Sequence, residues 1–289
     1  MSHSRLGLPS LYISIFLLSL TGLFAKLIPL DATSIIQLRS AVAAAGLALF
    51  ITLQNRRFKL SRKRTYAGVY GLGILLGLHW VTFFHAMQVS TVAIGMLAMF
   101  TFPVVTILLE PLFTRKKLKA GDIFAGVTVL AGLTIMVGSD LADLQKPVTL
   151  GVISGTFSAT LFALRNLLQK YRFAGESSDS LMLHQVVAVT LMLAMFVDYP
   201  GVKSLEAFSF FKIFLLGIFS TAAAHTLLVF SLKQLPAKTV ALIQCLQPLI
   251  AAVLAWLVIG EIPGLSVLLG GSLILSVATY ESAQKTRST

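Results

Sequence analysis

Long apolar stretches, separated by short polar connections, run through the whole sequence. Each stretch holds about 20 residues, which at about 1.5 Å per residue is enough to cross a hydrocarbon core about 30 Å thick. Buried spans are apolar on every face, so hydrophobic periodicity does not locate them well. The length of each apolar stretch, and the Gly, Pro and charged residues that interrupt the stretches, locate the helices better. The pattern predicts helices at residues 8–30, 32–54, 66–88, 90–113, 120–138, 148–170, 179–199, 208–232, 238–260 and 263–281.

One proline-bearing apolar segment occurs twice in the sequence. The segments MFTFPVVTILLEPLFTRK (Met99–Lys116) and QCLQPLIAAVLAWLVIGE (Gln244–Glu261) carry Pro103 and Pro248 at the same offset, 145 residues apart. An odd number of helices in each half makes the second copy enter the membrane from the opposite side. The sequence therefore predicts an all-α polytopic membrane protein with ten transmembrane helices in two inverted five-helix repeats. The predicted boundaries are 1–140 for the first repeat, 147–282 for the second and 283–289 for a cytoplasmic tail.

Composition and charge agree with a membrane protein. The chain of 289 residues is 56% hydrophobic and 12% charged, with a mean hydropathy of +0.88, whereas soluble domains are about 25% charged. The basic residues behind the net charge of +12 gather in the connections of one side, above all in Asn55–Arg64 and Arg115–Lys119. The connections of the other side hold little more than Lys146 and Lys203. This asymmetry is typical of cytoplasmic N and C termini and not of a nucleic-acid partner.

The arrangement resembles the EamA-type branch of the drug/metabolite transporter (DMT) superfamily over essentially the whole chain. The resemblance is carried by the two five-helix halves, the proline-bearing fourth helix of each, the closing Gly260-Glu261 and the approach QLPAK (Gln234–Lys238) to helix nine. One departure is Lys116, where family members often carry the glutamate that Glu261 supplies in the second half. The resemblance implies a transporter, and family members move amino acids, nucleobases, cofactor-like metabolites and drugs.

Both proline helices are candidate walls of a substrate cavity. A proline inside a helix frees the carbonyl four residues earlier, which here belongs to Met99 for Pro103 and to Gln244 for Pro248. A freed carbonyl in hydrocarbon needs a partner on a neighbouring helix or a wet cavity. Gln247 shares a face with Gln244 and brings a second amide. A packing kink with hydrogen bonds between helices is the alternative interpretation.

Aromatic residues and histidines form a second candidate group in the third helix, GLHWVTFFHAMQ. His79 and Phe83 are four residues apart, as are Trp80 and Phe84, so each pair shares a helix face. Aligning the halves through their prolines makes His225 the counterpart of Trp80. A place in the transport pathway competes with an interfacial aromatic belt for Trp80 and with a buried, hydrogen-bonded core histidine for His79.

Charged residues inside spans are costly and usually functional. Arg39 lies about a third of the way into the second helix, and we expect it to order the outer gate or to meet an anionic group. Arg165 and Lys26 lie nearer helix ends. For these two residues, a side chain that extends to the lipid headgroups is an alternative of equal weight to a functional role inside the protein. Glu110 is expected to pair with a basic residue of the Arg115 cluster.

Absent motifs narrow the function further. The sequence holds no P-loop, no His-Glu-x-x-His and no Cys/His cluster, so neither ATP drive, a metal nor a cofactor is expected. We expect a secondary transporter that moves a small organic solute, an amino acid or related metabolite, through the bilayer by alternating access. The expected location is a bacterial inner membrane, as a monomer or homodimer. A membrane-embedded enzyme acting on a lipid or isoprenoid substrate is the alternative.

Overall fold

The computed structural model describes most of the chain as helix. The described residues are 4–56, 58–61, 63–115, 120–138, 143, 145–173, 175–225, 227–228, 231, 243–244 and 246–284. In the first half the helices are α1 (Ser4–Ser19), α2 (Thr21–Leu27), α3 (Ala32–Leu53), α4 (Lys63–Val89), α5 (Val92–Met99), α6 (Phe102–Leu109), α7 (Pro111–Thr114) and α8 (Ala120–Val137). In the second half they are α9 (Pro147–Arg172), α10 (Ser178–Leu193), η2 (Ala194–Phe196), α11 (Tyr199–Lys203), α12 (Ala207–Gly217), η3 (Ile218–Ala223), α15 (Gln247–Ile259) and α16 (Leu265–Gln284).

The helices match the spans expected for a polytopic membrane protein. Within the described ranges, six helical stretches are long and apolar enough to cross a membrane: Gly7–Leu27, Ala32–Leu53, Thr65–Val89, Val92–Thr114, Pro147–Arg172 and Asp179–Phe196. Shorter apolar helices occupy the other four predicted spans, at Ala120–Met136, Ala207–Ala223, Gln247–Ile259 and Leu265–Val277. The predicted all-α fold is confirmed.

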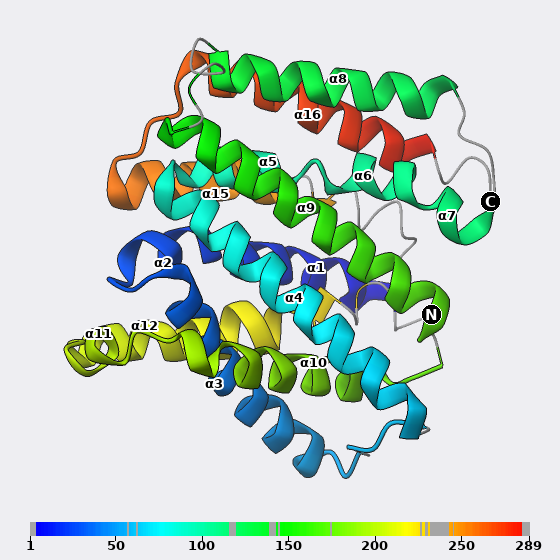
Figure 1. Ribbon diagram of the computed structural model, residues 1–289, viewed down its shortest axis with the longest axis vertical. Coiled ribbons are helices and arrows are strands. Elements are labelled where there is room, and N and C mark those ends of the chain that lie inside the picture. The colour runs from blue at the N-terminus through cyan, green and yellow to red at the C-terminus, as the bar shows by residue number, and fades with distance from the viewer. Residues whose placement is uncertain are drawn as a thin grey trace.

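The helices run back and forth between two sides of the molecule. Figure 1 shows α1 beginning and α16 ending on the same side, at the right of the view, which we call the termini side. The ends of α2 and α15, together with α11, lie on the opposite side, which we call the far side. The even number of crossings that the sequence predicts requires this placement of the two chain ends.

The packing of the two halves follows a pseudo-two-fold relation. Two pairs of counterparts, 145 residues apart, pack on each other: α3 with α10, and α8 with α16. Two further contacts of the first half have equivalents with the halves exchanged: α4 packs on α9 while η3 packs on α1, and α4 packs on α10 while α12 packs on α3. Such exchange indicates two related halves, with α3 and α10 at one end of the molecule and α8 and α16 at the other (Figure 1).

The fourth predicted span, 90–113, is interrupted where the sequence suggested one bent helix. It divides into α5, α6 and α7, because Pro103 and Pro111 have no N–H to donate and each stands in the first turn of a new helical segment. At the first break the Thr101 hydroxyl donates to the Ala98 carbonyl at 2.8 Å, which satisfies an acceptor that the break exposes. A second difference is α11, in a stretch predicted as connection, which starts where the Asp198 carboxylate accepts the Gly201 N–H at 3.1 Å.

Two glycines bring α8 and α16 into close contact. A Cβ added to Gly132 of α8 would lie 2.8 Å from the Gly270 carbonyl oxygen of α16, closer than backbone atoms tolerate. A Cβ on Gly126, one and a half turns earlier, would meet only the Leu108 side chain, at 3.6 Å. The packing of these helices therefore depends on the absence of a side chain at position 132.

Gly132→Ala is expected to destabilise the protein by about 1–3 kcal/mol, because the added methyl group forces α8 and α16 apart. The melting temperature of the purified protein in detergent should fall by several degrees. Gly126→Ala is the matched control on the same helix and should leave the melting temperature unchanged. Equal melting temperatures for the two variants would contradict the packing described here.

Candidate functional site

A cavity of about 420 Å³ lies between the two halves and reaches the termini side. Lys170, whose side chain is 64% exposed, lies at its rim with Glu176 and Asp179. The polar side chains of its wall are Arg165, Asn166, Gln169, Gln185, His225 and Gln244. Its apolar wall includes Leu47, Leu76, Phe102, Phe162, Met182 and Leu228. Both halves contribute, as expected for a site on the pseudo-two-fold axis.

Amide groups hold the guanidinium of Arg165 against the cavity wall. Its Nε and one terminal nitrogen donate to Gln185 Oε1 of α10 at 2.9 and 2.6 Å, and the other terminal nitrogen donates to Asn166 Oδ1 at 2.9 Å. Gln185 is itself fully buried and donates to Gln169 Oε1 at 3.2 Å. Arg165 therefore points into the protein and does not extend along the helix to the headgroups, one of the two outcomes left open by its sequence position.

Trp80 and its counterpart His225 face each other, with ring centroids 6.1 Å apart. The Arg39 guanidinium lies over the Trp80 ring, 4.2 Å from its centroid, and 5.0 Å from the centroid of Phe84. Since His225 lines the cavity, this stack of Arg39, Trp80 and His225 leads from the second helix to the cavity wall. The structure thus brings together three residues that the sequence placed in different helices.

His79 and Phe83 lie in the core beside this stack. His79 is buried, and its Nδ1 lies 2.7 Å from Ser158 Oγ and 3.1 Å from the Ser158 carbonyl oxygen. Ser158 Oγ lies 2.8 Å from the His79 carbonyl oxygen, so the two residues are linked twice between α4 and α9. Phe162 separates the imidazole from the cavity, with ring centroids 4.7 Å apart. The geometry favours the core-histidine interpretation for His79.

The two prolines occupy equivalent positions in the two halves. Pro103 is the second residue of α6, and Pro248 is the second residue of α15. Met99 is buried in the core, whereas Gln244 reaches the cavity wall. The Gln247 carbonyl accepts a hydrogen bond from the Ser19 hydroxyl at 3.2 Å, which joins the start of α15 to α1.

The two proline-bearing spans also end alike. Arg115, the C-cap of α7, has φ 56°, and Gly260, the C-cap of α15 145 residues later, has φ 70°. Both residues are left-handed, which ends the helix by turning the chain away from its axis. The helices α6 and α15 therefore begin at equivalent residues, and the two spans end at equivalent left-handed residues. The residues that follow these ends, Lys116 and Glu261, carry opposite charges.

A π-helical turn shapes the helix that carries His225. η3 (Ile218–Ala223) follows α12 without a break, and the Thr221 hydroxyl donates to the Leu216 carbonyl, five residues earlier, at 2.9 Å. The wider turn inserts an extra residue and so rotates the residues that follow it. It packs against α3 in the region of Arg39, because a Cβ on Gly217 would meet the Arg39 carbonyl at 3.0 Å. The sequence carries no local sign of this turn.

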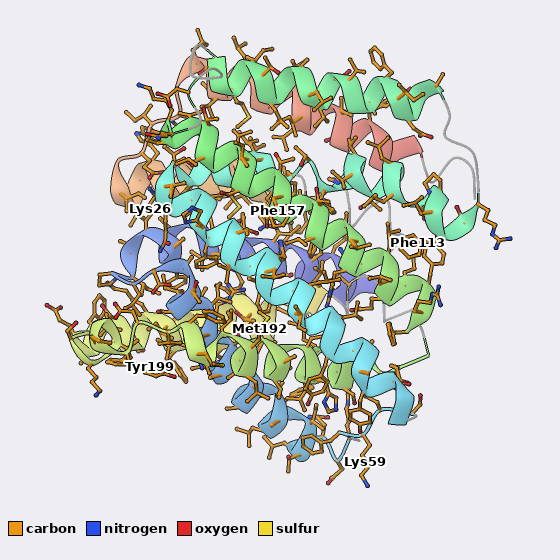
Figure 2. All side chains as sticks on the ribbon, viewed as in Figure 1. Lys26, Lys59, Phe113, Phe157, Met192 and Tyr199 are labelled. Carbon is orange, nitrogen blue, oxygen red and sulfur yellow. The ribbon has the colours of Figure 1, made fainter. Side chains whose placement is uncertain are left out.

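Polar contacts join the halves on the far side. Lys26 forms an ion pair with Glu261 at 3.3 Å and donates to the Ser90 carbonyl at 2.6 Å. The other Glu261 oxygen accepts the Val92 N–H at 2.8 Å, at the start of α5. Lys26 is thus held by the protein and does not extend to the headgroups. Figure 2 shows Lys26 and Tyr199 on this side and Lys59 and Phe113 on the other.

The termini side has its own ionic contacts at the rim of the cavity. Asp179 pairs with Arg56, and the Glu176 carboxylate accepts hydrogen bonds from the Ser61 hydroxyl and N–H. Glu110 pairs with Lys170 at 3.2 Å and accepts the Tyr171 hydroxyl at 2.8 Å. The expected partners of Glu110 at positions 116, 117 and 119 lie outside the described residues. In the described part of the chain, no three His, Cys, Asp or Glu side chains are placed to hold a metal ion.

Comparison with known proteins identifies the family. The model of the EamA-like transporter family matches residues 5–138 and again residues 149–279. The chain belongs to the EamA-like transporter family.

The relatives agree with this membership. An "Uncharacterized transporter YxxF" of Bacillus subtilis (strain 168) is 23% identical over 261 residues, which cover 89% of this chain and 83% of that protein. A solved structure described as "Crystal structure of protein" has a TM-score of 0.66 at 16% identity, covering 99% of this chain and 98% of its own, and supports the fold. The protein is an integral membrane transporter of the drug/metabolite transporter superfamily, so its partners are a small molecule and the lipid bilayer.

Several wall residues of this EamA-like transporter were not found from the sequence. Asn166 and Gln169 follow Arg165 on α9, and Gln185 lies within an apolar part of α10. Their signal was a polar side chain in an otherwise apolar span, which in hydrocarbon requires a partner. Phe102 and Phe162 carried no such signal, because apolar residues occupy every face of these helices.

In the EamA-like transporter Ser158→Ala is expected to lower stability by about 1–2 kcal/mol, since buried His79 Nδ1 loses its nearest partner. The melting temperature in detergent should drop by a few degrees. Thr160→Ala is the control, because the Thr160 hydroxyl only returns to the Thr156 carbonyl of its own helix. A Ser158→Ala protein as stable as wild type would show that this link contributes nothing.

Proposed function

We propose that this transporter moves a small organic solute by alternating access, with the central cavity as its binding site. The observation that carries the proposal is an asymmetry. The cavity reaches one side of the molecule, at Lys170, while on the other side Lys26 and Glu261 join the two halves. A binding space that is accessible from one side and closed on the other is what alternating access requires.

The cavity wall suits an amphipathic solute. Phenylalanine and leucine side chains supply apolar contact area, and Gln185, Gln244 and Asn166 supply amide donors and acceptors. Few polar groups in an otherwise apolar pocket orient a small ligand without excluding related ones. An amino acid or a related metabolite has this combination of an apolar body and polar ends.

The proposed orientation places the termini side in the cytoplasm of a bacterial inner membrane. α4 begins and α7 ends on that side (Figure 1), and the basic segments of the sequence, residues 55–64 and 115–119, adjoin these helix ends, as cytoplasmic Lys and Arg do. The state described here then faces inward. In the proposed cycle, repeats 1–140 and 147–282 rock about the bound solute, which closes the cytoplasmic mouth while the contact between Lys26 and Glu261 separates.

Counterflow tests the proposal directly. Proteoliposomes loaded with unlabelled phenylacetate, L-phenylalanine or phenethylamine are diluted into a trace of the same labelled compound. A carrier accumulates label transiently, because its loaded site returns faster than its empty one. The recovered label is expected to be chemically unchanged, and label converted to product would instead support an enzyme. Absence of counterflow for anions, zwitterions and cations alike would contradict the proposal.

Variants locate the site. Gln244→Ala and Trp80→Ala are expected to lower counterflow at least tenfold per folded molecule, because one removes an amide of the wall and the other removes the ring beside His225. Gln54→Ala and Trp256→Ala are the matched controls, since both side chains are exposed away from the cavity. Folded protein is selected by gel filtration before reconstitution. Equal loss in controls and test variants would remove the cavity from the proposal.

Cross-linking tests the closed far side. In a Cys245→Ser background, Lys26→Cys and Glu261→Cys together are treated with a short, reducible bifunctional thiol reagent. Counterflow should be abolished by the cross-link and restored by reduction, because the halves are held together where the far side must open. Each single-cysteine variant should transport at the same rate before and after the same treatment, because one cysteine alone cannot be cross-linked within the chain. Full transport by the cross-linked protein would contradict alternating access through this gate.

A further inference from the structure

Among the residues that the structure describes, Arg39 is a buried cation without a counterion. Its side chain is 2% exposed and lies against the rings of Trp80 and Phe84. Its Nε is completely buried and has no hydrogen-bond partner, and no hydrogen bond or ion pair joins Arg39 to any residue that the structure describes. Donors in such a position are usually satisfied within the protein, since an unpaired buried charge is strongly unfavourable.

No carboxylate in the sequence is placed to neutralise it. The chain has eleven Asp and Glu residues, and each lies in a connection or within about a turn of the end of a span. Arg39 begins the third turn of α3, well inside its span. No carboxylate that the structure describes balances Arg39, which leaves a bound molecule as the source of the negative charge.

A second cation faces the same space. Arg165 lines the cavity, and the groups that accept its hydrogen bonds are the neutral amide oxygens of Gln185 and Asn166. At the rim, the carboxylates of Asp179 and Glu176 are already engaged, by Arg56 and by Ser61. The inner part of the cavity is consequently positive, with neutral amides and apolar side chains around it.

Arg39 is connected to this space through Trp80. The Trp80 ring contacts both the guanidinium, which lies 4.2 Å from its centroid, and the ring of His225, 6.1 Å away between centroids, and His225 lines the cavity. In a water-poor interior the field of two uncompensated guanidinium groups acts over such distances with little screening. Arg39 and Arg165 therefore act on the same bound molecule.

We propose that the transported solute is a small organic anion, a carboxylate with an apolar body, and that Arg39 and Arg165 recognise its charge. This inference rests on the proposed function and names the substrate class of the same cavity. The carboxylate supplies the missing counterion, and its apolar body packs on Phe102, Phe162 and Met182. The solute binds most tightly when its charge neutralises these arginines. Closure of the cavity is then favoured only when the solute is bound.

Binding by the purified full-length protein tests the inference without requiring transport. Benzoate, phenylacetate and 3-phenylpropionate are each compared with the matching amide, by the rise in melting temperature that each ligand causes in detergent. The acids should stabilise wild-type protein and the amides should not, because each pair differs in charge and hardly in shape. Competition with labelled phenylacetate then gives the relative affinities.

Arg39→Gln should weaken binding of the preferred acid at least tenfold and leave the ligand-free melting temperature unchanged or higher, because it removes an unpaired buried charge. Arg39→Lys, which keeps the charge, should restore part of the affinity. Arg172→Gln is the matched control for loss of one arginine, since that side chain is exposed outside the cavity, and it should bind as wild type does.

The outcomes separate this inference from the proposed function. Acid binding that depends on Arg39, without counterflow, would support recognition of the acid by Arg39 and contradict the proposed function. No acid bound better than its amide, or an Arg39→Gln protein with the acid preference of wild type, would overturn the inference whether or not counterflow is observed. An Arg39→Gln protein that melts well below wild type without ligand would show a structural role and would also overturn it.

Discussion

Hydrocarbon offers no hydrogen-bond partners, so every polar group placed between the two sides of this protein needs a partner within the protein. This constraint explains most of the internal contacts. His79 is linked twice to Ser158, Arg165 is held by Gln185 and Asn166, and the Thr101 hydroxyl satisfies a carbonyl at a helix break. Arg39 departs from the pattern, and the departure lies beside the cavity.

Inversion of the two repeats gives equivalent segments different surroundings. The proline-bearing spans begin and end alike, with left-handed caps at Arg115 and Gly260. In the second half the residue after the cap, Glu261, pairs with Lys26 and accepts the N–H of Val92. Its counterpart in the first half is Lys116, which has the opposite charge. The second copy of the segment therefore contributes to closing the far side. The first copy, which carries Lys116 at the equivalent position, cannot form the same ion pair with a lysine, so the two sides of the protein differ.

Much of the fold was predictable from the order of residues alone. Length of apolar stretches located the spans, and the spacing of Pro103 and Pro248 indicated the repeat. The interruption at Thr101, the short helix α11 and the π-helical turn at 218–223 were missed, because each depends on hydrogen bonds that only the packed structure selects. Of the candidate residues, Arg165, His225 and Gln244 line the cavity, while His79, Phe83 and Met99 lie in the core.

The sequence by itself determined that the chain crosses a membrane in two inverted halves, since apolar length, proline spacing and the placement of Lys and Arg are properties of the chain. It also identified Arg39 as a charged residue inside a span. Only the tertiary structure decided which side chains face the cavity and which partners they take, such as Glu261 for Lys26 and Trp80 for Arg39. The physical reason is that a span apolar on every face carries no periodicity to show which face meets the cavity, so packing between distant helices makes that choice.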